Sequence, residues 1–420
     1  MKYKQILILL IFGCLKNAQC NDTSADQIAN VLNEKEISKD DINNFLENFA
    51  KATKEKNEEK IKKLFDFKTF WRKVVEDNPF IESLEKQEML YSFTVQRLCK
   101  LFSDEIQGIH YDRHEIILFE YSKLNSDEIH LITRIWQGSI SFKTKWRISF
   151  TDSKIRAFDF ELVGMPSSFI KTYGIGIQAA HNKEISKKVL LAFLEIIKEA
   201  SIATEIEDYE SLLPKLLSLE DESMPNFFND FMHFYKSFCF TQLGEFRAGL
   251  YFADRIKGSD LNYLSLIRAN CLNGLEKFGE ALSHCEKYKS SVGVDDEYFY
   301  QLGEAYMGLE DQAKAFRAFR SGIADDPQSA VFCVMGLIKH LPNENLGEIE
   351  LHYKSLNNSQ QEGAGIFHNF LNEDDTDSVR RLYFIHKKLH PDDTEVLELM
   401  KEFINFGAIL NSLSNSEIID

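Results

Sequence analysis

Two carboxylates near the end of a strand-like segment are the residues of this sequence best placed to do chemistry. Asp159 and Glu161 alternate with Phe158 and Phe160, so both carboxylates would lie on one face of a strand. Abstraction of a proton next to a carbonyl needs a carboxylate base that faces an apolar cavity beside a neutral hydrogen-bond donor. The bulky side chains of Phe158, Phe160 and Leu162 favour the opposite face for the core. We therefore expect Asp159 and Glu161 to face solvent and keep them as catalytic candidates of second rank.

Other residue types that carry catalysis or bind metals show no supporting pattern. His110, His114 and His130 lack the spacing of metal ligands, and no cysteine pair has the Cys-x-x-Cys spacing. Neither a serine nucleophile elbow nor a phosphate-binding loop is present in the sequence. Five cysteines fall within apolar helical patterns, which is typical of small core side chains: Cys99, Cys239, Cys271, Cys285 and Cys333. We therefore expect no metal site and no cofactor, and a binding protein rather than an enzyme.

The elements that would position Asp159 and Glu161 are helices followed by strands. Apolar residues at helical spacing predict helices from Ser38, around residues 61–65 and from Leu90 to before Gly108. After Gly108 the period changes to two, which predicts antiparallel strands. These strands are expected at residues 114–119, 129–136, 140–150 and 155–163. Helices grouped against one face of such a sheet make an α+β domain, expected over residues 21–180.

This order of elements resembles the nuclear transport factor two-like superfamily, which includes ketosteroid isomerase. The resemblance rests on the opening helix NFLENFAKATKEKNEEKIKKLF and the closing strands KTKWRISFTDSKIRAFDFELVGMPSSFIKTYG, and it covers about residues 36–180. The closing stretch, with Asp159, Gly164 and Tyr173, is also similar to a periplasmic phospholipid-carrier family of related fold. These resemblances imply helices that cap a curved antiparallel sheet and leave a conical pocket for an apolar small molecule or lipid.

The second part of the chain predicts one helix after another. Its clearest unit, EYFYQLGEAYMGLEDQAKAFRAFRSGIADDPQSA, resembles the tetratricopeptide repeat, with Gly303 as the small residue that lets the second helix approach. Gly249, Ala281 and Ala315 hold one equivalent position at intervals of 32 and 34 residues, and the family period is about 34. The resemblance covers about residues 227–392 and implies an all-α array of stacked helix pairs.

These patterns predict the organisation of the whole chain. Residues 1–20 are expected to be a signal peptide and residues 21–180 the α+β domain with a cone-like shape. Bridging helices follow at residues 181–226, and the tetratricopeptide-type array with a C-terminal capping helix occupies residues 227–420. The fold class is therefore an α+β domain followed by an all-α helical repeat array.

A groove on the helical array is the candidate binding site. Stacked helix pairs curve so that the first helix of each pair lines a concave face. Three stripes at i, i+4 and i+7 predict that lining: Phe234, Phe238 and Thr241; Leu266, Asn270 and Asn273; and Tyr300, Glu304 and Met307. Apolar side chains with asparagines suit an extended peptide, because an asparagine amide can pair with a peptide backbone. We expect Tyr300 to lie off the packing face; for Phe234 and Phe238, packing beneath a neighbouring helix is the alternative.

The first twenty residues predict export. Two lysines precede an apolar run at residues 6–15, and small residues precede a possible cut near Cys20, as in a secretory signal peptide. The run is half the length that spans a bilayer, so we expect no transmembrane helix in the mature chain. The expected location is the periplasm or the outside of the cell. The alternative is a membrane-tethered lipoprotein modified at Cys14, because residues 11–14 resemble a bacterial lipobox.

The charge balance restricts the partners. The formal net charge of −17 argues against nucleic acid, whose phosphates require clustered lysine and arginine. The sequence therefore predicts an exported interaction module that binds a partner protein or extended peptide through its helical repeats. The alternative function places an apolar ligand or lipid, with isomerase-like chemistry, in the first domain and gives the repeats a recruiting role.

Overall fold

The described residues form two compact units. The computed structural model describes residues 38–82, 87–100, 113–121, 128–137, 140–151, 154–162, 170–171, 173–174, 177, 208–218, 226–257, 263–342, 345–372 and 375–416. Unit 1 holds the described residues up to Cys271 together with Lys287–Gly293, and unit 2 holds Leu272–Glu286 and those from Val294 onward. The predicted signal peptide, Cys14, His110, Gly164 and the boundary near residue 180 lie outside the described residues.

Unit 1 begins with short helices whose ends are encoded locally. They are α3 (Lys39–Lys54), α4 (Glu58–Leu64), α5 (Phe67–Asp77), α6 (Pro79–Glu82) and α7 (Gln87–Lys100). At the start of α3, the Asp41 N–H donates to Ser38 Oγ and the Ser38 N–H donates to the Asp41 carboxylate, which completes a capping box. Phe45 and Phe49 on this helix are buried, as the predicted helical face requires. Helix α5 was not predicted from the sequence.

Four antiparallel strands follow in simple order. They are β1 (Arg113–Tyr121), β2 (Glu128–Gln137), β3 (Ile140–Thr151) and β4 (Lys154–Leu162), each paired with its neighbour in the chain. The predicted period of two is confirmed on β2, where Ile129, Leu131 and Ile135 are buried in the core. The register between β3 and β4 shifts between Arg147 and Ile148, so Phe158 is an extra residue on β4. A bulge of this kind bends its strand and interrupts the alternation of faces.

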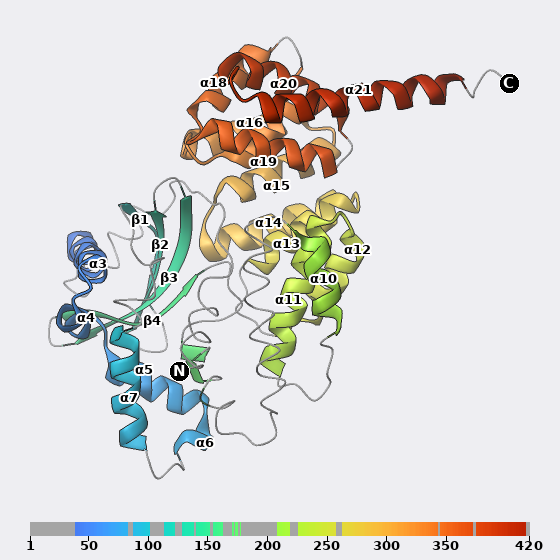
Figure 1. The fold of residues 1–420 in the computed structure, drawn as a ribbon. Helices are drawn as coiled ribbons and strands as arrows, with labels where there is room; N and C mark the ends of the chain where they lie inside the picture. Colours follow the sequence, from blue (N-terminus) through green and yellow to red (C-terminus); the bar gives the residue numbers. More distant parts are fainter. Residues whose placement is uncertain are drawn as a thin grey trace. The chain divides into compact units, whose positions relative to one another are not determined.

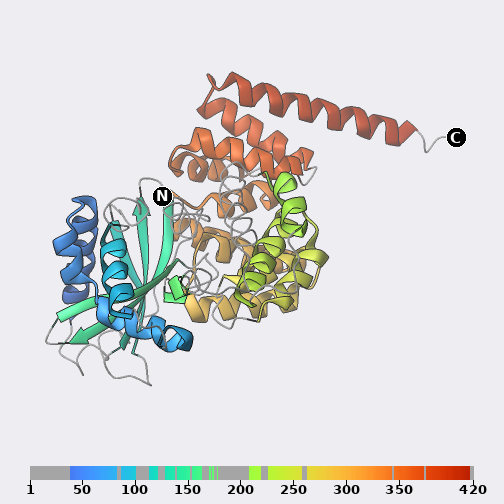
Figure 2. The same cartoon turned by 60° about the horizontal axis from the view of Figure 1, so that its bottom comes forward.

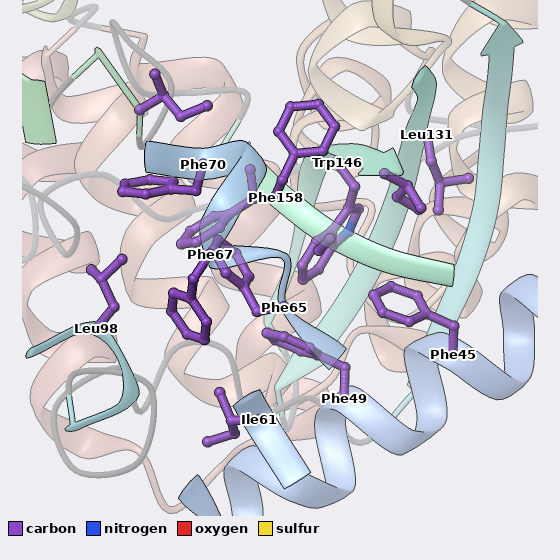
Figure 3. Close-up of a cluster of buried hydrophobic side chains, with 14 of the residues drawn as sticks. Phe45, Phe49, Ile61, Phe65, Phe67, Phe70, Leu98, Leu131, Trp146 and Phe158 are labelled. Atoms are coloured by element: carbon purple, nitrogen blue, oxygen red, sulfur yellow. The ribbon is translucent and has the colours of Figure 1, made fainter. Parts of the chain in front are cut away.

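The core of this α+β region is packed with aromatic rings. Figure 3 shows Phe45, Phe49, Phe65, Phe70 and Trp146 gathered between the helices and the sheet. The rings of Phe49 and Trp146 meet edge to face with centroids 5.3 Å apart. The indole N–H of Trp146 donates to Thr133 Oγ1 at 2.9 Å, so the polar atom of this large buried side chain is satisfied. Helices α3, α4 and α5 all contact β4.

The rest of the described chain is helical (Figures 1 and 2). The helices are α10 (Tyr209–Ser218), α11 (Asn226–Gln242), α12 (Phe246–Arg255), α13 (Leu264–Gly274), α14 (Phe278–Val292), α15 (Asp296–Gly308), α16 (Gln312–Asp325), α17 (Val331–His340), α18 (Leu346–Ser355), α19 (Ser359–Asn372), α20 (Thr376–Leu389) and α21 (Thr394–Ser416). The protein is therefore mostly helical, with a small antiparallel sheet in its N-terminal region followed by helices. Every helix among the described residues is too short or too polar to span a bilayer.

One turn geometry recurs between successive helices. Gly244, Glu276 and Glu310 have φ values of 74°, 59° and 62°, which is the left-handed region. In each case the following residue donates its N–H to a carbonyl five residues earlier, at 2.8, 2.8 and 2.9 Å. The three turns recur at intervals of 32 and 34 residues, the same intervals as the small residues predicted from the sequence. Three helix pairs, α11–α12, α13–α14 and α15–α16, therefore share one local design.

Small residues allow the paired helices to approach closely. A Cβ atom added at Gly249 would lie 2.7 Å from Thr241 Oγ1 and 2.9 Å from Cys271 Sγ. One added at Gly303 would overlap the ring of Phe319 on α16. Ala281 and Ala315, at the positions equivalent to Gly249, are fully buried. The prediction that Gly303 lets the second helix of its pair approach closely is therefore confirmed.

The five cysteines of the described residues are buried, as predicted. Burial raises the pKa of Cys99 to about 11 and that of Cys285 to about 12. It also raises the pKa of Cys271 to about 11 and that of Cys333 well above its usual value. Because the thiolate is the reactive form, these thiols behave as core side chains.

Candidate functional site

The two candidate catalytic carboxylates are buried rather than exposed. Asp159 is fully buried and Glu161 is 9% exposed, so the expectation that both face solvent is wrong. One oxygen of Asp159 accepts the backbone N–H of Ile170 at 2.9 Å. The other lies 3.5 Å from the Arg147 guanidinium across the β3–β4 pair. Asp159 is buried because the later segment that contains Ile170 packs against it, and an alternating strand pattern does not predict such a contact. Both carboxylate oxygens of Asp159 interact with groups of the protein itself.

A row of charged side chains continues from Asp159 across the sheet. His130 on β2 pairs in register with Arg147 on β3, and Arg147 pairs with Asp159 on β4. Glu128, which is 7% exposed, accepts from Arg147 Nε at 3.0 Å and lies 3.0 Å from His130 Nε2. Lys73 on α5 comes within 3.9 Å of the same carboxylate. The hydrogen bond with His130 and the positive charges of Arg147 and Lys73 lower the pKa of Glu128 to about 2.

Removal of the Glu128 charge tests whether this row stabilises unit 1. We expect Glu128→Gln to lower the free energy of unfolding by about 2 kcal/mol, because Arg147 and Lys73 lose a charged acceptor that is shielded from water. Since the folded pKa is depressed, this stability is present above about pH 4.5 and is lost as the pH falls toward 2. Urea unfolding at pH 7 and at pH 3 measures both effects.

The matched control is Glu76→Gln. Glu76 pairs with Arg72 and Lys73, but its side chain is 48% exposed, so the expected change is within about 0.5 kcal/mol. Equal losses in the two variants would show that the Glu128 cluster is an ordinary surface pair.

The predicted groove stripes lie partly in the hydrophobic core. Four of their residues are buried: Phe234, Thr241, Leu266 and Tyr300. Tyr300 is 8% exposed and lies among rings of two neighbouring helices, with centroids 6.2 Å from Phe319 and 5.8 Å from Phe332. The expectation that Tyr300 lies off the packing face is therefore wrong. Helix α15 contacts both α16 and α17, so its apolar residues are covered on more than one side.

Phe234 also belongs to a core, that of unit 1, together with Phe231 and Tyr235. Its ring meets that of Tyr235 edge to face with centroids 5.7 Å apart. The Thr241 hydroxyl donates to the Ser237 carbonyl at 2.7 Å. For Phe234, the alternative of packing beneath a neighbouring helix is the correct one.

The remaining stripe residues are half-buried: Phe238, Asn270, Asn273, Glu304 and Met307. The ring of Phe238 meets that of Tyr209 edge to face at 5.6 Å. Asn273 Nδ2 donates to both the backbone and side-chain oxygens of Gln301 at 2.9 Å, so this amide group already serves the fold. The prediction that these residues contact a peptide stays a prediction.

Sequence reasoning missed a charged group beside Glu304. His340 Nε2 lies 2.7 Å from Glu304 Oε1, and Lys339 Nζ lies 3.5 Å from Oε2; both partners belong to α17. Burial alone would raise the pKa of Glu304, but the hydrogen bond with His340 and the charge of Lys339 lower it below its usual value. The sequence did contain a signal for this contact. If Gly336 is aligned with Gly303 as the equivalent small residue of the next helix pair, His340 takes the position equivalent to Met307. We call Glu304, Met307, Lys339 and His340 the inner strip.

Two further buried polar contacts have no counterpart in the sequence analysis. Asp296 on α15 accepts the N–H groups of Phe332 and Cys333, at the start of α17, at 2.8 and 2.9 Å. His386 lies between the Tyr353 hydroxyl, 2.6 Å from Nδ1, and Asp393, 3.0 Å from Nε2. Burial lowers the pKa of His386, so the ring is neutral and accepts at Nδ1 while donating to Asp393.

Neither arrangement forms a metal site. No group of three or more His, Cys, Asp or Glu side chains in the described part of the chain could hold a metal ion. The polar contacts of unit 2 hold helices together. The inner strip lies on two helices that contact each other, α15 and α17, and its side chains are partly exposed. Searches against protein-family models, curated proteins and solved structures found no match to this chain.

Proposed function

We propose that the protein is an exported interaction module that binds a partner protein or extended peptide through a tetratricopeptide-type array. The observation that carries the proposal is the recurrence of one left-handed turn at Gly244, Glu276 and Glu310. Repeated helix pairs build extended surfaces formed by equivalent residues of successive units, and such surfaces suit elongated ligands. Export remains part of the proposal because residues 1–20 have the pattern of a signal peptide.

The inner strip is the surface that we assign to the partner. Glu304 and Met307 come from α15, and Lys339 and His340 come from α17, so two helices that contact each other contribute to one strip. The Glu304 carboxylate is compensated by its two neighbours, so the strip combines hydrogen-bonding groups with the apolar Met307 in an otherwise acidic chain. Polar groups that can pair with a backbone, beside an adaptable thioether, suit an extended peptide.

Peptides selected on the full chain test this assignment. Phage-displayed peptides would be selected against the unsubstituted protein, and the dissociation constant of the best binder would be measured for Met307→Ala. Loss of a side chain in the centre of an interface weakens binding by about 1–3 kcal/mol, which is about 5- to 150-fold. We therefore expect Met307→Ala to weaken the complex by at least about fivefold. Because Met307 also packs against the core of unit 2, the melting temperature is expected to fall slightly, and circular dichroism would verify that the variant is folded at the temperature of the binding measurement.

Leu309→Ala is the matched control. Leu309 is an apolar residue two positions further on, 48% exposed and outside the inner strip, so its replacement should leave affinity unchanged. If no selected peptide distinguishes Met307→Ala from Leu309→Ala, the inner strip is not the binding surface.

The alternative function, an apolar ligand in the first domain, receives less support. A nuclear transport factor two-like cone would need space between its helices and sheet. In the described residues that region contains the packed rings of Phe49, Phe65, Phe70, Trp146 and Phe158 (Figure 3). Saturable binding of a fluorescent fatty acid to the full chain, insensitive to Met307→Ala, would reverse our ranking of the two functions.

A further inference from the structure

Helix α21 carries a seven-residue repeat of apolar side chains. Val396, Phe403 and Leu410 follow one another at intervals of seven, and so do Leu399, Phe406 and Leu413. The two series alternate at three and four residues, which is the pattern of the a and d positions of a coiled coil. Such a repeat along one helix predicts a partner helix with the same repeat. Val396 and Phe403 pack against the core of their own unit, so we call the other four residues, Leu399, Phe406, Leu410 and Leu413, the α21 seam.

Only part of α21 is used by its own unit. Met400 is fully buried and Leu397 is 9% exposed. Val396 and Phe403 also pack against the core of unit 2, and the ring of Phe403 meets that of Phe367 edge to face with centroids 6.4 Å apart. Two members of the seam point elsewhere: Leu399 is 50% exposed and Phe406 is 59% exposed. Both views show the C-terminal part of α21 running on beyond the other helices of unit 2 (Figures 1 and 2). The backbone of α21 therefore continues past its neighbours, and Leu410 and Leu413 belong to that part of the sequence.

The chemistry of this part of α21 also favours burial. From Phe403 to Ser416 the sequence contains no charged residue, although the whole chain carries a net charge of −17. Two copies of such an acidic chain repel each other over most of their surface, and a neutral seam avoids that repulsion. A helix of this length gains most of its stability from packing of an apolar face.

We propose that α21 pairs with α21 of a second copy of the chain, which makes the protein a homodimer. A second copy brings a helix with an identical seven-residue repeat, and a two-fold axis places the seam against itself. The exposed rings of Phe406 and the side chains of Leu399 would then fill the holes of the facing helix. The dimer is independent of the partner-binding function proposed above, because the inner strip lies on α15 and α17.

Sedimentation equilibrium of the full chain tests the dimer. We expect the mass to approach twice 48.7 kDa at micromolar concentration. Phe406→Glu should raise the dimer dissociation constant by at least about a hundredfold, because it places a charge in the centre of a desolvated seam on both copies. Circular dichroism and the melting temperature of unit 2 would verify that the variant folds.

Asn405→Glu is the matched control, because it adds the same charge at an exposed neighbouring position outside the seam. It should leave the mass doubled. A monomer at every concentration, or a dimer that survives Phe406→Glu, would refute the proposal. So would a monomer that binds zwitterionic vesicles through Phe406, since the seam would then serve a membrane surface.

Discussion

Replacement of Gly303 by leucine is expected to lower the free energy of unfolding of unit 2 by about 3 kcal/mol or to prevent its folding. An added side chain would overlap the Phe319 ring on α16. That ring has little room to move, because a Cβ atom added at Gly336 on α17 would also overlap it, and His340 stacks on it with ring planes 7° apart. The three helices α15, α16 and α17 would therefore have to separate. Hydrogen exchange read by mass spectrometry would localise the loss to their peptides.

Gly365→Ala provides the control for this result. Gly365 lies inside α19, and a Cβ atom added there would meet nothing within 4 Å. Alanine should stabilise the helix by about 0.5–1 kcal/mol, because it restricts the unfolded chain without a steric conflict. If the two glycine substitutions changed stability equally, close approach at Gly303 would not be what sets the packing of α15 and α16.

Asp296→Ala is expected to destabilise unit 2 by about 2–3 kcal/mol at pH 7. The N-cap position of α17 is Ala330, which has no side-chain hydrogen bond to offer. The two carboxylate oxygens of Asp296 supply the cap from α15, and they bond the N–H groups of Phe332 and Cys333. Loss of that carboxylate leaves two buried donors unsatisfied. Urea unfolding, with hydrogen exchange of residues 331–340, measures the effect.

The pH dependence of stability distinguishes a role of the Asp296 carboxylate as a helix cap from a role of its side chain in packing alone. Complete burial raises the pKa of Asp296 from 3.8 to about 7. The folded chain therefore holds a proton that the unfolded chain releases, and the associated stability falls as the pH rises from about 4 to about 7. Asp296→Asn does not titrate, so its stability relative to the unsubstituted protein should improve over that range. A difference that stays constant from pH 4 to pH 7 would contradict the assignment.

Local patterns predicted the elements of unit 1 well and its contacts poorly. The strands were recognised because apolar residues such as Ile129, Leu131 and Ile135 alternate along the chain, although Ile132 and Arg134 on the other face of β2 are buried too. Helix α5 was missed although Phe67, Phe70 and Val74 follow a helical spacing after the N-cap Asp66. The burial of Asp159 goes with a bulge at Phe158, which exists only in the pairing of β3 with β4, and with Ile170, which lies beyond the end of the strand.

In the helical part, the groove residues were harder to predict than the recurring helix pairs. Gly303 was recognised because its role, close helix approach, is local to one helix pair. Tyr300 was placed outside the core, although its ring lies beside Phe319 of the same helix pair and Phe332 of the following helix. The cap that Asp296 provides joins residues 36 positions apart, so no window of one repeat contains it. Contacts between one helix pair and the next are the part of the structure that sequence periodicity does not predict.

The buried cysteines have a kinetic consequence. A thiol reagent can attack Cys99 or Cys271 only when unit 1 opens, and Cys285 or Cys333 only when unit 2 opens. Their raised pKa values keep the thiols protonated, which slows the reaction further in the folded protein. The rate at which its cysteines react therefore reports how often each unit opens. In an oxidising compartment, the order in which these sulfur atoms are modified would record which unit loosens first.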